Sequence, residues 1–109
     1  MTTDKPVGIL SNMGVRQLLN RRLVLEPNAF AEMVIWQLPH IQPGSAHQFK
    51  YRLAFVVDGE CILRYDNEAG KGDHRHRAGR ETSYVFTSID AKVKDFFNDV
   101  TRWRNENHG

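Results

Sequence analysis

The feature that most constrains the fold is the dipeptide Asp58-Gly59, which separates two segments that both alternate apolar and polar residues. Glycine readily adopts the positive φ that a two-residue hairpin turn requires, and alternation with a period of two is typical of a half-buried strand. In residues 49–58, the apolar face carries Tyr51, Leu53, Phe55 and Val57. In residues 60–66, it carries Cys61, Leu63 and Tyr65. These segments therefore predict an antiparallel hairpin with one apolar face.

Three more segments have the composition of strands. Residues 22–25 are short and apolar and end at Pro27-Asn28, so a hairpin turn is expected over 26–29. Residues 30–38 are largely apolar on both faces, as expected for a central strand, and residues 83–87 form a later candidate. With the Asp58-Gly59 hairpin, these segments predict an antiparallel meander of about five strands.

The C-terminal segment has helical periodicity. Its apolar residues recur every three or four positions; they are Ile89, Val93, Phe96, Phe97, Val100 and Trp103. This spacing places them on one face of an amphipathic helix. Thr87, followed three residues later by Asp90, is interpreted as the capping box that begins the helix. The sequence thus predicts an α+β domain in which this C-terminal helix packs on one face of the meander sheet.

Length and composition bound the remaining possibilities. A chain of 109 residues that is 40% hydrophobic can build a single domain with a real core. Residues 1–20 are interpreted as a loose N-terminal leader, in which 15–20 are a candidate for a short helix, and residues 21–109 as the domain.

Cys61 is expected to be a buried, unreactive thiol. Because no signal peptide and no apolar run of membrane-spanning length is recognised, a soluble cytoplasmic protein is expected.

The densest group of ionisable residues follows the predicted strand 60–66. Lys71, Asp73, His74, Arg75 and His76 fall within six positions. Arg64 and Asp66 occupy one face of the strand before them, so their side chains project together beside this loop. If the chain is extended from Asp73, His74 and His76 share a face and Arg75 lies on the other. His40 and His47, which flank a Pro/Gly loop, are expected to be exposed.

These residue types fit cleavage of a phosphodiester bond without a metal ion or other cofactor. Imidazole titrates near neutral pH, so His74 and His76 can serve as general base and general acid, in an order that the sequence does not assign. Lys and Arg would stabilise charge on the phosphoryl oxygens, and an aspartate would orient an imidazole. The candidate catalytic residues are His74, His76, Lys71, Arg75, Asp66 and Asp73.

Any binding of phosphate groups must come from local cations, because the net charge of the chain is only +2. The candidate nucleic-acid-binding residues are Arg64, Lys71, Arg75, Arg77 and Arg80. Two other interpretations stay open. One is a metal site formed by His74, His76 and a carboxylate, which the neighbouring cations disfavour. The other is a solvated hairpin loop or a protein-binding surface, since runs of charge usually form solvated faces.

Several motifs in the chain are distinctive. They are YRLAFVVDG at 51–59, LRYDNE at 63–68, GKGDHRH at 70–76, YVFTS at 84–88 and DFFNDV at 95–100. Together these motifs resemble the TumE family of toxins from type II toxin–antitoxin systems. The resemblance extends over about residues 23–103 and does not include the segment before Arg21.

The resemblance implies a bacterial toxin that inhibits growth and is neutralised by a helix-turn-helix antitoxin, with RNA as the expected target. It carries no catalytic residues over to this chain, and a homodimer stays open. Two functions therefore remain. The first is a metal-independent endoribonuclease that uses the histidine-containing loop. The second is a non-enzymatic toxin that binds nucleic acid or a protein.

Overall fold

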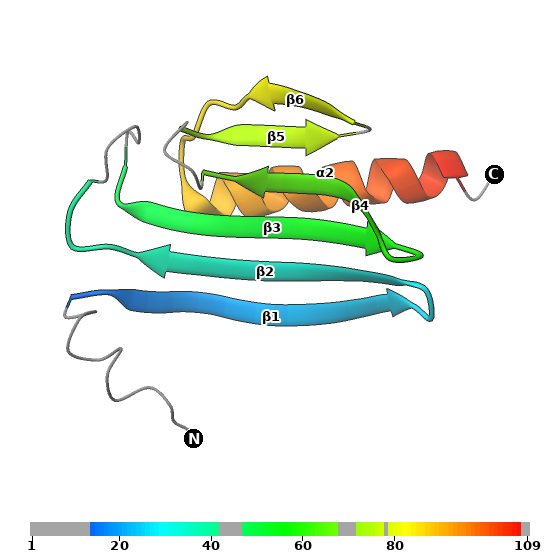
Figure 1. Cartoon of the computed structure of the whole chain (residues 1–109), viewed down its shortest axis with the longest axis horizontal. Helices are drawn as coiled ribbons and strands as arrows, with labels where there is room; N and C mark the ends of the chain where they lie inside the picture. Colours follow the sequence, from blue (N-terminus) through cyan, green and yellow to red (C-terminus); the bar gives the residue numbers. More distant parts are fainter. Residues whose placement is uncertain (1–13, 42–46, 68–71, 78, 108–109) are drawn as a thin grey trace, which may run out of the picture.

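The computed structural model describes residues 14–41, 47–67, 72–77 and 79–107. In these residues a six-stranded antiparallel sheet has the order β1-β2-β3-β4-β5-β6, followed by one helix (Figure 1). The elements are β1 (Arg16–Glu26), β2 (Ala29–Gln37), β3 (Phe49–Val57), β4 (Glu60–Asp66), β5 (His74–Arg77), β6 (Arg80–Ser83) and α2 (Ile89–Asn107). The predicted α+β meander with a C-terminal helix is confirmed, with six strands in place of about five.

Helix α2 lies behind the sheet in Figure 1 and covers one of its faces. We call this the helix-covered face; it includes Ile35, Leu53 and Tyr65, which are at most 1% exposed. The opposite, open face includes the residues that alternate with these, such as Val34, Arg52 and Asp66. The buried hydrophobic core comprises Ala29, Ala31, Met33, Ile35, Tyr51, Leu53, Phe55, Leu63, Tyr65, Phe96 and Val100.

The hairpin between β3 and β4 forms where the sequence predicts it. Asp58 and Gly59 both have positive φ, 52° and 79°, which a type I′ turn requires. Cys61, however, is exposed, so the expectation of a buried thiol is wrong. The register shifts between Phe55 and Val56, and Ile62 is the extra residue in β4. This bulge reverses the alternation and moves Cys61 off the core face.

The N-terminal part of the sheet differs from the prediction. A short helix over 15–20 is wrong, because residues 16–20 are the first half of β1, which pairs with β2 along its whole length. In this register Leu19 lies opposite Ile35 and Leu23 opposite Ala31, so both leucines pack against the core. Pairing along the edge of β2 therefore outweighs the weak local pattern of this segment. The predicted leader before residue 14 lies outside the described residues.

The last part of the sheet also departs from the prediction. Residues 84–88 are not a strand; the sheet ends instead with β5 and the short strand β6. The aromatic rings of Tyr84 and Phe86 pack between Lys92 of α2 and aromatic residues of β3 and β4. The helix begins one residue later than the predicted capping box, because the hydroxyl of Ser88 accepts the hydrogen bond from the backbone N–H of Ala91.

None of the described helices has the length and apolar character that a membrane span requires.

We predict that truncating the centre of the helix–sheet contact strongly destabilises the domain. Phe96 is fully buried and packs edge-on against Tyr65, with ring centroids 5.8 Å apart. Phe96→Ala should lower the free energy of unfolding by about 3–5 kcal/mol. Val85→Ala removes a side chain that is 82% exposed and should change it by less than about 0.5 kcal/mol. Urea denaturation followed by circular dichroism measures both, and equal effects would contradict this packing.

Candidate functional site

Strand β5 distributes the predicted site residues over two faces of the sheet. His74 lies opposite Asp66 and His76 opposite Arg64, so these four residues share the open face. Arg75 lies opposite Tyr65 and therefore belongs to the helix-covered face. The expectation that the two histidines share a face, with Arg75 on the other, is confirmed.

The open-face histidines have different environments. His74 Nδ1 lies 2.8 Å from Glu81 Oε2 on β6, and only 11% of the His74 side chain is exposed. A carboxylate at this distance fixes the orientation of the imidazole by pairing with one of its ring nitrogens. The Nδ1 atom of His76 is buried and has no hydrogen-bond partner among the described atoms. Sequence reasoning missed Glu81, because its position opposite His76 depends on the unpredicted pairing of β5 with β6.

Arg64 and Asp66 lie together beside the histidines, as predicted. Arg64 Nε is 2.9 Å from Asp66 Oδ2, and the contact is ionic rather than a well-aligned hydrogen bond. The side chain of Arg64 is 35% exposed, so its guanidinium is accessible from the open face. Arg64 therefore supplies positive charge next to His76, and Asp66 balances part of that charge.

The arginines of β5 instead contact the helix. Arg75 Nη1 lies 3.6 Å and Arg77 Nη1 3.5 Å from the carboxylate of Asp99, which also accepts a 2.6 Å hydrogen bond from the Tyr65 hydroxyl. Arg102 Nη1 adds a third cation at 3.4 Å. A hydrogen bond with Tyr65 raises the pKa of Arg75. This cluster therefore ties β5 to α2 on the face opposite the two histidines.

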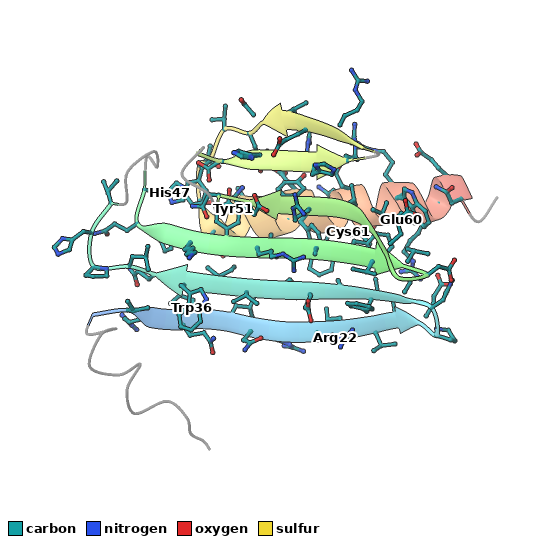
Figure 2. All side chains as sticks on the ribbon, viewed as in Figure 1. Arg22, Trp36, His47, Tyr51, Glu60 and Cys61 are labelled. Carbon is teal, nitrogen blue, oxygen red and sulfur yellow. The ribbon has the colours of Figure 1, made fainter. Side chains whose placement is uncertain are left out.

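Asp73 binds a different histidine from the one predicted. Its carboxylate lies 2.8 Å from His47 Nε2 and also accepts a hydrogen bond from the Tyr51 hydroxyl. His47 is not exposed as predicted: 10% of its side chain is accessible, and its ring stacks on Phe86 at 3.8 Å. Its Nδ1 accepts the Phe49 N–H, so in this geometry Nε2 carries the proton that it donates to Asp73. Figure 2 shows His47 and Tyr51 at the same end of β3.

A buried lysine that sequence reasoning also missed lies next to these groups. Lys92 is 1% exposed, and its ammonium nitrogen has no hydrogen-bond partner among the described atoms. It lies over four aromatic rings, with centroid distances of 3.8 Å to Tyr84, 4.2 Å to Tyr51, 5.2 Å to Tyr65 and 5.5 Å to Phe86. The rings stabilise the cation through their quadrupoles. Lys92 falls three residues after Ile89 and four before Phe96, which places it on the apolar stripe of the helix. This position is the sequence signal that could have indicated its burial.

The acid–base properties of this helix-covered cluster follow from burial. Burial lowers the pKa of Lys92 to about 8, against the opposing attraction of Asp73 and Asp95. Burial and a hydrogen bond to Asp99 raise the pKa of Tyr65 to about 12. Burial also raises the pKa of Tyr51 and of Tyr84, each of which donates a hydrogen bond to an aspartate. These tyrosines stay protonated at neutral pH and act as hydrogen-bond donors.

The remaining predicted residues are dispersed. Arg77 and Arg80 face each other at the exposed end of the β5–β6 hairpin. Lys71 lies outside the described residues. Within the described part of the chain, no three His, Cys, Asp or Glu side chains are grouped closely enough to hold a metal ion. The residues that the structure brings together on the open face are thus His74, His76, Arg64, Asp66 and Glu81.

A comparison with known proteins identifies the family. The sequence model of the family described as Toxin TumE matches residues 12–104. The chain belongs to the TumE toxin family. No curated protein and no solved structure matches it. Membership in this family supports a toxin function and implies an antitoxin as partner.

We predict that the buried Lys92 makes the stability of this TumE-family chain depend on pH. Between pH 7.5 and 9.5 the folded lysine, with its pKa of about 8, loses its proton, whereas an unfolded lysine keeps it up to its ordinary value of 10.5. The unfolded state then binds more protons, so the free energy of unfolding rises with pH, by roughly 1–2 kcal/mol over this window. Urea midpoints at pH 7.5, 8.5 and 9.5 measure the rise.

The matched control is Lys92→Met, which retains the length of the side chain without an ionisable group. Between pH 7.5 and 9.5, the free energy of unfolding of this variant should rise by roughly 1–2 kcal/mol less than that of the wild type. The window ends below pH 10, because ionisation of the unfolded tyrosines lowers stability at higher pH. An equal rise in wild type and Lys92→Met would show that Lys92 is not the group responsible.

Proposed function

We propose that this toxin is a metal-independent endoribonuclease that cleaves RNA at the open face, with His74 and His76 as its acid–base pair. The observation that supports this most directly is the contact of His74 Nδ1 with Glu81 Oε2 beside a second imidazole on the same face. Glu81 takes the orienting role that the sequence suggested for Asp66 or Asp73. The alternation of β5 puts the two imidazoles about 7 Å apart along the strand. This spacing suits groups acting on opposite sides of one phosphate.

The reaction uses groups already present on the open face. One imidazole removes the proton from the ribose 2′-hydroxyl, and the 2′-oxygen attacks the adjacent phosphorus. The bond to the 5′-oxygen breaks, and the second imidazole supplies the proton that this leaving oxygen takes up. The products are a 2′,3′-cyclic phosphate and a 5′-hydroxyl. The guanidinium of Arg64, opposite His76, stabilises the charge that develops on the phosphoryl oxygens.

The other predicted residues have supporting roles in this proposal. Arg75 holds β5 in position through Asp99 and Tyr65, and Asp73 anchors the start of the same strand through Tyr51 and His47. Lys71, Arg77 and Arg80 contribute positive charge that attracts the phosphate backbone. We further propose that a helix-turn-helix antitoxin neutralises the toxin in the cytoplasm, as the family resemblance implies.

We predict that loss of either histidine of β5 abolishes activity without unfolding the protein. His74→Ala and His76→Ala should each lower the rate of RNA cleavage by about 10²–10⁴-fold, the range for a lost general acid or base. Growth inhibition on induction should be lost in parallel. Glu81→Gln keeps the shape of the residue that orients His74 and should have a smaller effect, of about tenfold. Urea denaturation verifies that each variant is folded.

The matched control for these variants is His40→Ala, which removes an exposed histidine outside β5 and should retain full activity. Full toxicity in both His74→Ala and His76→Ala would overturn the proposed acid–base pair. Toxicity without any detectable RNA cleavage by the wild type would instead favour a non-enzymatic binding mode.

We predict that cleavage survives chelation. Purified toxin incubated with total RNA should cut it equally well in the presence and absence of EDTA, because the scheme assigns no step to a metal ion. The new 3′ ends should be 2′,3′-cyclic phosphates, which block ligases that require a 3′-hydroxyl until the ring is opened and the phosphate is removed. Loss of cleavage on chelation and its return with a divalent cation would support the metal-site interpretation of His74 and His76.

A further inference from the structure

A hollow of about 430 Å³ opens beside β2 and β3, away from the two histidines. Its lining includes Trp36, Val34 and Leu38 as an apolar wall and Lys50 and Arg52 as cations. Figure 2 shows Trp36 toward the end of β2 at the same end of the sheet as His47. The volume falls within the range of small-ligand sites. The acid–base scheme makes no use of this hollow.

The charge in the hollow has one sign. Its described lining residues include Lys50 and Arg52 and no carboxylate. Lys50 is exposed and pairs in register with Trp36, so the two side chains are cross-strand neighbours. Arg52 shares its charge with Glu32 at 3.8 Å, but both side chains are 40% exposed, and a bound anion can compete for the guanidinium. An aromatic surface beside two cations suits a ligand that has flat rings and negative charge.

The strand register connects the hollow to the proposed catalytic residues. Arg52 lies opposite Asp66, and Asp66 lies opposite His74, so a row of open-face residues leads from the hollow to the acid–base pair. Trp36 on β2 is three strands from His74 on β5, which corresponds to about 14 Å across the sheet. A single strand of a few nucleotides spans such a distance. The open face, which no other described element covers, provides its path.

We propose that the hollow is a subsite for one base of single-stranded RNA, which stacks on Trp36 while neighbouring phosphates contact Lys50 and Arg52. The identification of RNA rests on the proposed function, but the subsite itself rests on the aromatic and cationic lining. Stacking on an aromatic side chain tolerates any base, since every base has a flat π face. The subsite therefore contributes affinity and register rather than strict sequence specificity.

Binding of a fluorescein-labelled, 2′-O-methylated oligonucleotide tests the subsite, because this RNA has no free 2′-hydroxyl and cannot be cleaved by the proposed route. Trp36→Ala should weaken binding about 5- to 100-fold in fluorescence anisotropy, and Trp36→Phe should lose less. Lys50→Gln and Arg52→Gln should each reduce the slope of log affinity against log salt by about 0.7. The control is Phe30→Ala, which also removes an aromatic ring from β2. The guanidinium of Arg22 already covers this ring, 3.8 Å from its centroid, so the ring is not available for a base.

The outcomes separate this proposal from the proposed reaction. If Trp36→Ala binds the labelled RNA with an affinity within twofold of wild type, the subsite is overturned. Weaker binding of the antitoxin by this variant would not rescue it, because the hollow would then be a protein-binding surface. A loss of affinity for Trp36→Ala and Phe30→Ala alike also overturns it, since the effect is then not local to the hollow. Trp36-dependent binding by a toxin that never cleaves RNA supports the subsite and contradicts the endoribonuclease proposal.

Discussion

In the described residues one helix, α2, covers one face of the sheet, and the role of each strand side chain depends on the face to which it points. The helix-covered face holds the apolar core, and the charges on it are paired or enclosed by aromatic rings. The open face has no second layer among the described residues, so its polar side chains contact one another and solvent rather than a second element. Strand β5 shows this division most clearly, because neighbouring residues along it belong to opposite faces.

Charge inside the core has a structural explanation. Asp99 is 6% exposed and Lys92 1%, positions where an isolated charge would be costly. Asp99 receives three arginines and a tyrosine hydroxyl, so its negative charge is compensated and hydrogen-bonded. Lys92 lies over four aromatic rings and feels the attraction of Asp73 and Asp95, but burial still lowers its pKa. Both residues belong to α2, so the helix fixes its position on the sheet through polar as well as apolar contacts.

The sequence predicted those parts of the fold that depend on local pattern. Three such features are the Asp58-Gly59 turn, the alternation of β3 and the apolar stripe of α2. Each depends on residues that lie close to one another in the sequence. Long-range pairing decided the rest: β1 is a strand because β2 offers it an edge, and Tyr84 packs on Lys92 instead of joining the sheet. The bulge at Ile62, which exposes Cys61, has no signal in composition.

The candidate site was predictable to a similar degree. The shared face of His74 and His76 follows from alternation alone, and so does the pairing of Arg64 with Asp66. Glu81 could not be assigned without knowledge of β6, which is hydrophilic throughout and resembles a loop in the sequence. His47 and Asp73 are 26 residues apart, and no local rule joins them. Tertiary contact therefore determined which carboxylate each histidine meets.

The position of β5 and β6 at the edge of the sheet has a consequence for dynamics. Each has only four residues, every residue of β6 is exposed, and the attachment of β5 to the helix relies largely on ion pairs. Such segments open at a lower free energy than the global unfolding of the domain. Amide hydrogen exchange should therefore be fast in β5 and β6 while β2 and β3 remain protected. We expect the hairpin that carries both histidines to open while the rest of the sheet stays intact, so a partner that binds the opened hairpin would disable the proposed site without unfolding the domain.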